Sequence, residues 1–231
     1  MARILTYFVL VIAAVICLFP FIWMVSTSFK PMSDIYSMPP TLIPKQSTLE
    51  NFVEGWKGAN FQLYFKNTAV ITFLATVGTV LSSSVVAYGF ARFQSRLSKI
   101  LFMVLLGTMM LPTQVTLIPQ YLLYYKLGMV DTIWPLIIPS WLGGGAFNIF
   151  LFIQFFRTLP KELDEAAKID GANSLQVFTR ILLPAVKPVM LAVLVMALVF
   201  NWNDFFNPLI YLNSNDKFTI AIGLQFFKGS Q

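Results

Sequence analysis

Five long apolar runs alternate with short polar segments along this chain of 231 residues. Each run is long enough to cross the hydrocarbon layer of a membrane, which needs about twenty apolar residues as a helix. The first run is too long for a signal peptide and no small-residue cleavage site follows it, so we expect it to be retained as a span. The pattern predicts an all-α, polytopic transmembrane helix bundle with spans near residues 4–29, 68–90, 100–122, 133–156 and 189–212.

The basic residues predict an orientation, because Lys and Arg accumulate on the cytoplasmic side of short loops. With the N-terminus inside, the cytoplasmic pieces are 1–3, 91–99 and 157–187, which hold nine of the sixteen Lys and Arg. The remaining seven are spread over longer loops on the other side. We therefore expect a multi-pass membrane protein with a cytoplasmic N-terminus.

Small residues recur within two of the predicted spans. In the second span they fall every four residues, on one stripe of a helix where a neighbouring backbone can approach closely. The fourth span contains three consecutive glycines, Gly143–Gly145, which permit tight contact or bending. We interpret both features as helix packing; the stripe consists of Ala75, Thr79, Ser83 and Ala87.

The composition supports the membrane class and excludes several chemistries. Hydrophobic residues make up 57% of the chain and charged residues only 11%, whereas soluble domains carry about a quarter of their residues as charges. The net charge of +6 is scattered between the apolar runs, so nucleic acid is not an expected partner. The chain has no His, and its one cysteine, Cys17, lies in an apolar run. Histidine-dependent catalysis and His- or Cys-ligated metal sites are therefore not expected.

The longest polar interruption, residues 158–188, cannot lie in lipid, because each charge at the bilayer centre costs about 2.5–3.5 kcal/mol. Its first part has the features of a short helix. Pro160 suits a first turn, acidic residues follow where the helix dipole favours them, and Asp164 precedes Lys168 by the four residues of a helix ion pair. One face of this helix is predicted to group Leu163, Ala166, Ala167 and Asp170.

A second short helix is predicted after a glycine corner. Gly171 can end the first helix as a left-handed cap, and Asn173 with Gln176 resembles a capping box that opens the next helix. Pro184 is expected to end this second helix before the fifth span. Its apolar stripe is predicted to be Leu175, Phe178, Ile181 and Leu182.

The letters EAAKIDGA and ILLP in this segment closely resemble the EAA loop of importer permeases in the ATP-binding-cassette (ABC) superfamily. That pattern is Glu-Ala-Ala, three residues, Gly, nine residues, then Ile-x-Leu-Pro, and residues 165–184 fit it without a gap. The phrases LPTQVTLIPQYLL, LGMVDTIWPLIIP and NWNDFFNPLIYL resemble the carbohydrate branch, specifically the smaller membrane subunit of maltose-type importers. The resemblance covers nearly the whole chain.

This resemblance implies the type I ABC importer permease fold in a prokaryotic cytoplasmic (inner) membrane. Residues 157–187 would form a cytoplasmic coupling loop whose first helix docks into an ATPase subunit. The alternative is a well-capped, solvated helix pair without a special role. The residues implied in coupling are Glu165, Ala166, Ala167, Asp170 and Gly171.

The resemblance also implies partners: a homologous larger permease subunit, two cytoplasmic ATPase subunits and an extracytoplasmic sugar-binding protein, with membrane lipid around the spans. No Gly-x-x-x-x-Gly-Lys phosphate loop occurs in the chain. We therefore expect no cofactor in this chain and no enzymatic activity of its own, with ATP and Mg bound by the partner ATPase subunits.

Polar side chains gather toward the outer half of the fifth predicted span. Such residues usually face a bundle interior or a wet cavity, so they could line a translocation path. They could equally serve as interhelical contacts near the outer interface. The residues are Asn201, Asn203, Asp204 and Asn207.

The end of the chain, NSNDKFTIAIGLQFFKGSQ, resembles an outer loop that contacts the external binding protein. Its tip would comprise Lys228, Gly229, Ser230 and Gln231. The family has a sixth span after this loop, so we expect a C-terminally truncated sequence. The chain is assigned as one transmembrane permease domain, 1–231, with a family core at about 66–231.

Two rival functions follow from the residues. A secondary transporter driven by an ion gradient would need titratable groups deep in the spans, and only Asp204 comes close. An intramembrane enzyme would need acid/base groups, and no carboxylate pair occurs within the predicted spans. Both are weaker than the importer hypothesis.

Overall fold

The computed structural model describes residues 2–58 and 60–229, and all regular secondary structure in these ranges is helical. The chain forms two compact units, Met1–Gln62 and Leu63–Gln231. The assignment of a single permease domain stays a prediction.

The first unit contains α1 (Ala2–Ser28), α2 (Met32–Ile35) and α3 (Glu50–Gly58). The apolar side chains of α1 are exposed along its length, as a helix facing lipid or another subunit requires. The loop after it is ordered by Lys30, whose ammonium donates to the carbonyl of Thr41 and lies 5.0 Å from the ring centre of Trp23. The Asn51 amide donates to the carbonyls of Ser28 and Lys30. The segment between the first two long apolar helices therefore includes two short helices, α2 and α3.

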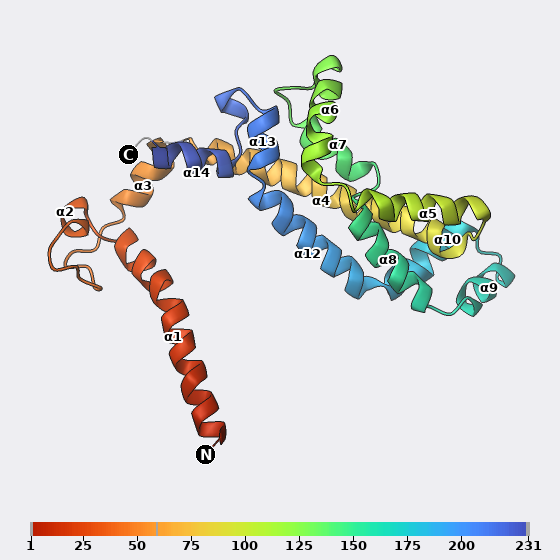
Figure 1. The fold of residues 1–231 in the computed structure, drawn as a ribbon, viewed down its shortest axis with the longest axis horizontal. Coiled ribbons are helices and arrows are strands. Elements are labelled where there is room, and N and C mark those ends of the chain that lie inside the picture. Colours follow the sequence, from red (N-terminus) through yellow and green to blue (C-terminus); the bar gives the residue numbers. More distant parts are fainter. Residues whose placement is uncertain (1, 59, 230–231) are drawn as a thin grey trace. The chain divides into compact units, whose positions relative to one another are not determined.

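A single long helix, α4, runs along the second unit (Figure 1). The helices at one end of α4 include α9 and α10, and those at the other end include α13 and α14. The helix begins seven residues before the predicted span, because the polar residues around Asn67 still find partners there. The elements are α4 (Phe61–Arg92), α5 (Arg96–Thr108), α6 (Thr113–Lys126), α7 (Trp134–Trp141), α8 (Ala146–Thr158), α9 (Glu162–Ile169), α10 (Ser174–Val177), η1 (Phe178–Leu182), α11 (Leu183–Ala185), α12 (Lys187–Asn203), α13 (Phe206–Tyr211), η2 (Asn215–Lys217) and α14 (Ile220–Gly229).

Three helical stretches within the described residues are long and apolar enough to cross a membrane: Arg3–Ser28, Phe61–Arg92 and Trp134–Thr158. The number rises to five if two bent pairs each count as one span. These five stretches correspond to the five predicted ones, but two of them are not straight.

The predicted span at residues 100–122 is wrong as a continuous helix. It is α5 followed by α6, with a bend of 102° between them. Pro112 causes the break, because its nitrogen carries no hydrogen and its ring disfavours the helical conformation at Leu111. The predicted span at 189–212 also ends early: α12 stops at Asn203, and the short helix α13 follows.

The main core lies where α4, α8 and α12 meet the charged segment. Phe152, Ile153, Phe156, Val177 and Leu182 are fully buried in one cluster there. The segment that composition places in water is thus fixed to the bundle by apolar contacts on its inner side.

The small-residue stripe of α4 is buried, which confirms its interpretation as a packing surface. At Thr79 its partner is the glycine run between α7 and α8, and Ala87 packs in the main core. A Cβ added at Gly144 would lie 2.6 Å from the carbonyl oxygen and 2.9 Å from the Cα of Thr79. The Ser82 hydroxyl donates to the carbonyl of Ser140 at 2.7 Å. The three glycines, all with positive φ, therefore turn the chain, and Gly144 lets its backbone touch α4.

We predict that Gly144→Ala lowers the stability of the protein by about 2–4 kcal/mol, because the methyl group meets backbone and φ is +66°. Thermal unfolding of the purified protein in detergent measures this effect. The matched control is Gly89→Ala within α4, where an added Cβ meets nothing within 4 Å. Equal unfolding midpoints for the two variants would contradict this packing.

Candidate functional site

The charged segment has the predicted corner. Gly171 adopts φ +84°, its N–H donates to the carbonyl of Lys168, and the N–H of Ala172 donates to the carbonyl of Ala167. This pair of bonds is the Schellman cap that ends many helices. Asn173 and Gln176 form the predicted capping box, with side-chain-to-backbone distances of 2.9 and 2.8 Å. Two helices meeting at a glycine are therefore confirmed.

The inner face of α9 differs from the predicted one. Ala167 and Asp164 are buried, whereas the other members of the predicted face are exposed. Ala167 packs into the cluster of this chain itself, so its small size already serves an internal contact. Pro160 lies before the helix rather than in its first turn. Of the predicted coupling residues, Glu165, Ala166, Asp170 and Gly171 remain exposed.

Asp164 does not make the predicted ion pair with Lys168. Its Oδ2 instead lies 2.8 Å from Nε of Arg92, on the last turn of α4, and both side chains are about nine-tenths buried. The two guanidinium NH2 nitrogens of Arg92 donate to the carbonyl of Leu159 at 3.3 and 3.4 Å. Tertiary packing decides the pairing here, because a buried carboxylate needs a cation while the exposed Lys168 is solvated.

The second helix is present but irregular. It begins as α10, widens into the π-helical turn η1 and ends as α11 one residue after Pro184. Pro184 cannot donate to the carbonyl four residues earlier, which favours the wider turn. Val177, Phe178 and Leu182 are buried, and Ile181 packs at the edge of the cluster. The prediction that Leu175 belongs to the buried apolar stripe is wrong, because its side chain is exposed.

Large apolar side chains are exposed on both sides of the glycine corner. Ile169, the last residue of α9, is 86% exposed, and Leu175 at the start of α10 is 69% exposed. Leu163 is 40% exposed on α9. These residues lie among charges on a segment that composition places in water.

The polar residues of the predicted fifth span do not form one group. Asn201 and Asp204 line a small cavity together with Thr68 and Thr219, whereas Asn203 is exposed. The Asp204 carboxylate accepts from the backbone N–H and the side-chain amide of Asn207, three residues later. These contacts favour a structural role at the junction of α12 and α13, and the translocation-path assignment stays a prediction.

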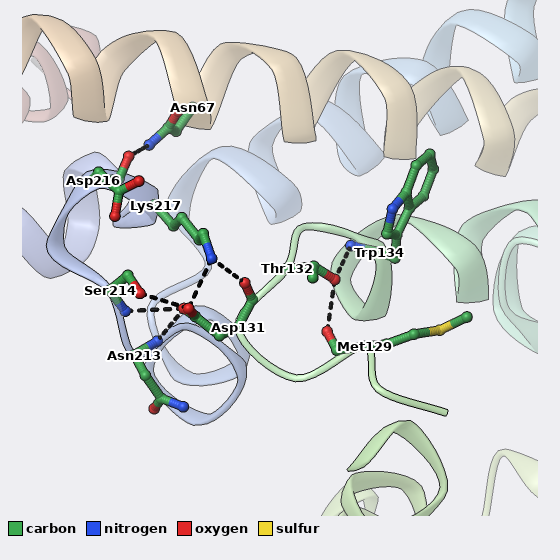
Figure 2. A network of polar contacts seen from close by, with 9 residues as sticks. All are labelled: Asn67, Met129, Asp131, Thr132, Trp134, Asn213, Ser214, Asp216 and Lys217. Atoms are coloured by element: carbon green, nitrogen blue, oxygen red, sulfur yellow. Dashed lines mark hydrogen bonds and ion pairs between the residues drawn. The ribbon is translucent and has the colours of Figure 1, made fainter. Parts of the chain in front are cut away.

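A polar network at the far end of α4 is absent from the sequence-based predictions. Figure 2 shows the Asp131 carboxylate at its centre, accepting from the N–H groups of Asn213 and Ser214, from the Ser214 hydroxyl and from Lys217. The Lys217 ammonium also donates to the carbonyl of Asp131 at 2.7 Å. The network ties the loop between α6 and α7 to the loop after α13. Hydrogen bonds from Lys217 first, then from Ser214 and Asn213, hold the pKa of Asp131 well below its usual value.

The same loop is attached to α4. The Asn67 amide donates to the carbonyls of Asp216 and Phe218 at 2.9 and 3.0 Å (Figure 2 shows the first). The hydroxyl of Thr68 accepts from the N–H of Ile220 at 2.8 Å. These residues are far apart in sequence and belong to no common motif, so only the fold reveals their association.

Half of the predicted tip of the outer loop lies outside the described residues. Lys228 and Gly229 are the last residues of the helix α14. Ser230 and Gln231 lie outside the described residues. A contact with a binding protein stays a prediction for all four.

Residues 78–231 match the family described as the binding-protein-dependent transport system inner membrane component. This range contains α9, the glycine corner and α10 to α12. The chain belongs to this family. It is therefore an inner-membrane permease component, and the resemblance inferred from the EAA letters is confirmed.

Relatives of this permease align over most of its length. It is 35% identical to a putative ABC transporter permease protein of Caldicellulosiruptor sp. (strain Rt8B.4), over 90% of this chain and 76% of that protein. It is 33% identical to the trehalose/maltose transport system permease protein MalG of Thermococcus litoralis, over 98% of this chain and 82% of that protein. It is 34% identical to the lactose transport system permease protein LacG of Rhizobium radiobacter, over 95% of this chain and 79% of that protein.

A solved structure confirms the fold. A chain of a bacterial ABC transporter involved in the import of the acidic polysaccharide alginate superposes with a TM-score of 0.85 at 23% identity. The match covers 98% of the permease and 79% of that chain. The predicted type I importer permease fold is therefore confirmed.

We predict that Asp131→Asn lowers the thermal stability of the permease at pH 7 by about 1 kcal/mol, since the ion pair is only partly buried. Because the folded pKa is depressed, the carboxylate stabilises the fold above its unfolded pKa of about 4, and this contribution is lost as pH falls below that value. The difference in unfolding midpoint between variant and wild type should therefore shrink below about pH 4. Asp216→Asn, an exposed neighbour, is the control. A difference that does not change with pH would contradict the network.

Proposed function

We propose that this permease is one of two membrane-spanning subunits of an ATP-driven sugar importer. Its relatives are named for trehalose/maltose and for lactose transport, which supports a sugar as the transported solute. A homologous larger permease would complete the translocation path, and an extracytoplasmic binding protein would deliver the sugar. These relatives favour the ATP-driven importer over a transporter driven by an ion gradient.

The exposed glycine corner is the observation that carries the coupling role. A solvated helix pair would turn polar groups outward, yet Ile169 and Leu175 project from this corner among exposed charges. The core does not need them, since Ala167, Val177 and Leu182 fill it. An apolar centre with a charged rim is the anatomy of a protein–protein interface. These exposed apolar residues support the proposal that an ATPase subunit contacts this corner.

The chemistry assigned to the complex is divided between subunits. Two cytoplasmic ATPase subunits would bind ATP and Mg and hydrolyse the nucleotide. This permease would contribute only a conformational change. An ATPase subunit would bind α9 from the cytoplasmic side, and the helices connected to α9 would move with it. The orientation that follows has the N-terminus, the loop between α4 and α5, and the charged segment in the cytoplasm.

We predict that a cysteine at Ile169, in a Cys17→Ser background, crosslinks to an ATPase subunit of the assembled importer. A short reagent that joins the cysteine thiol to an amine, followed by separation of the products by mass, measures the contact. The matched control is Leu209→Cys in α13, which is 45% exposed but lies at the other end of α4. Crosslinking of neither position, or of both equally, would contradict the docking surface.

A further inference from the structure

The last two turns of α4 contact both helices of the charged segment. Arg92 pairs with Asp164 of α9, and it also donates to the carbonyl of Leu159, which directly follows α8. One guanidinium thus contacts the end of α8 and the inner face of α9 together. A planar fork of donors allows this double contact, whereas a lysine ammonium is a single point.

Tyr88, one turn earlier on α4, contacts the start of the second helix. Its hydroxyl donates to the carbonyl of Ser174 at 3.2 Å. Its ring lies 5.1 Å from that of Phe178 and 6.3 Å from that of Phe156, measured between centroids. The polar contact fixes the position of α10, and the aromatic contacts hold the ring between α8 and η1.

These contacts leave the charged segment little freedom to move alone. Asp164 and Arg92 are both buried, so separating them would expose each to an apolar environment without a counter-charge. Ala167, next on the same face of α9, is packed in the same cluster as Val177 and Phe178. A displacement of α9 must therefore carry the cytoplasmic end of α4 with it.

We propose that Arg92 and Tyr88 are positioning residues for energy coupling, which hold both coupling helices to α4 so that they move as one body. This inference rests on the proposed function of α9 as the ATPase-contacting helix. Neither residue belongs to the EAA motif, and neither lies on the exposed docking surface. Their role is to transmit a displacement of the two coupling helices directly to the membrane-spanning helices.

The test measures the ratio of ATP hydrolysed to sugar imported in vesicles that contain the complete importer. Arg92→Met removes the charge and keeps much of the side-chain length. We expect this ratio to rise about two- to thirty-fold, the range by which such coupling changes when a connecting contact is lost. Arg92→Lys, which keeps the ion pair but not the contact with Leu159, should give an intermediate ratio. If Arg92 has a purely structural role, the Arg92→Met variant should lose ATP hydrolysis and sugar uptake in equal proportion. That result would overturn the proposal.

Arg96→Met is the matched control, because Arg96 is exposed at the start of α5 and has no ion pair among the described residues. Its ratio should equal that of the wild type. If the Arg92→Met importer does not assemble, the Tyr88→Phe variant provides the test. Loss of the Tyr88 hydroxyl alone should raise the ratio of ATP hydrolysed to sugar imported. An unchanged ratio would overturn the proposal.

Different results would refute the proposed transport function and the positioning role of Arg92 and Tyr88. Wild-type vesicles without ATP-dependent sugar uptake would refute the proposed function itself. Wild-type vesicles that couple normally, with an equally well-coupled Arg92→Met variant, would refute only the positioning role.

Discussion

The buried ion pair between Arg92 and Asp164 is the interaction on which the charged segment and the adjoining end of α4 depend. The charged segment cannot enter lipid, yet it must be held rigidly against the helix bundle if it is to transmit force. The structure meets both constraints by giving the segment two faces. Its outer face carries charges and a few exposed apolar residues, while its inner face is fixed by the ion pair and by a fully buried cluster around Phe152, Phe156 and Leu182.

The helix α4 connects this anchored segment with the opposite end of the unit. It has 32 residues, or about 48 Å of helix, and contains no proline. Near its start, Asn67 and Thr68 form hydrogen bonds with the loop that leads into α14. The network around Asp131 forms further hydrogen bonds with the same loop. Between the two ends, the contact of Gly144 with Thr79 brings the α7–α8 backbone against α4. Attachments at both ends and in the middle suit a helix that moves as a rigid body.

Local signals in the sequence were sufficient for much of this arrangement. The glycine corner and the capping box depend on neighbouring residues, so Gly171, Asn173 and Gln176 could be predicted, and the apolar runs marked the spans. The partner of Asp164 could not be predicted, because Lys168 is the better local candidate and Arg92 lies 72 residues away in the sequence. The bend at Pro112 and the π-turn before Pro184 were missed because hydropathy reports burial in lipid and not helix continuity. The Asp131 network joins loops with no periodic pattern, so no sequence signal pointed to it.

The central claim is that α9 and α4 move together when the ATPase subunits close. The most direct measurement is the distance between spin labels at Lys168 on α9 and Val85 on α4, by pulsed electron paramagnetic resonance on the assembled importer. The account predicts the same mean distance and width in the nucleotide-free and ATP-bound states. A shift or a broadening of that distance on ATP binding would show that the charged segment moves independently of α4 and would contradict the account.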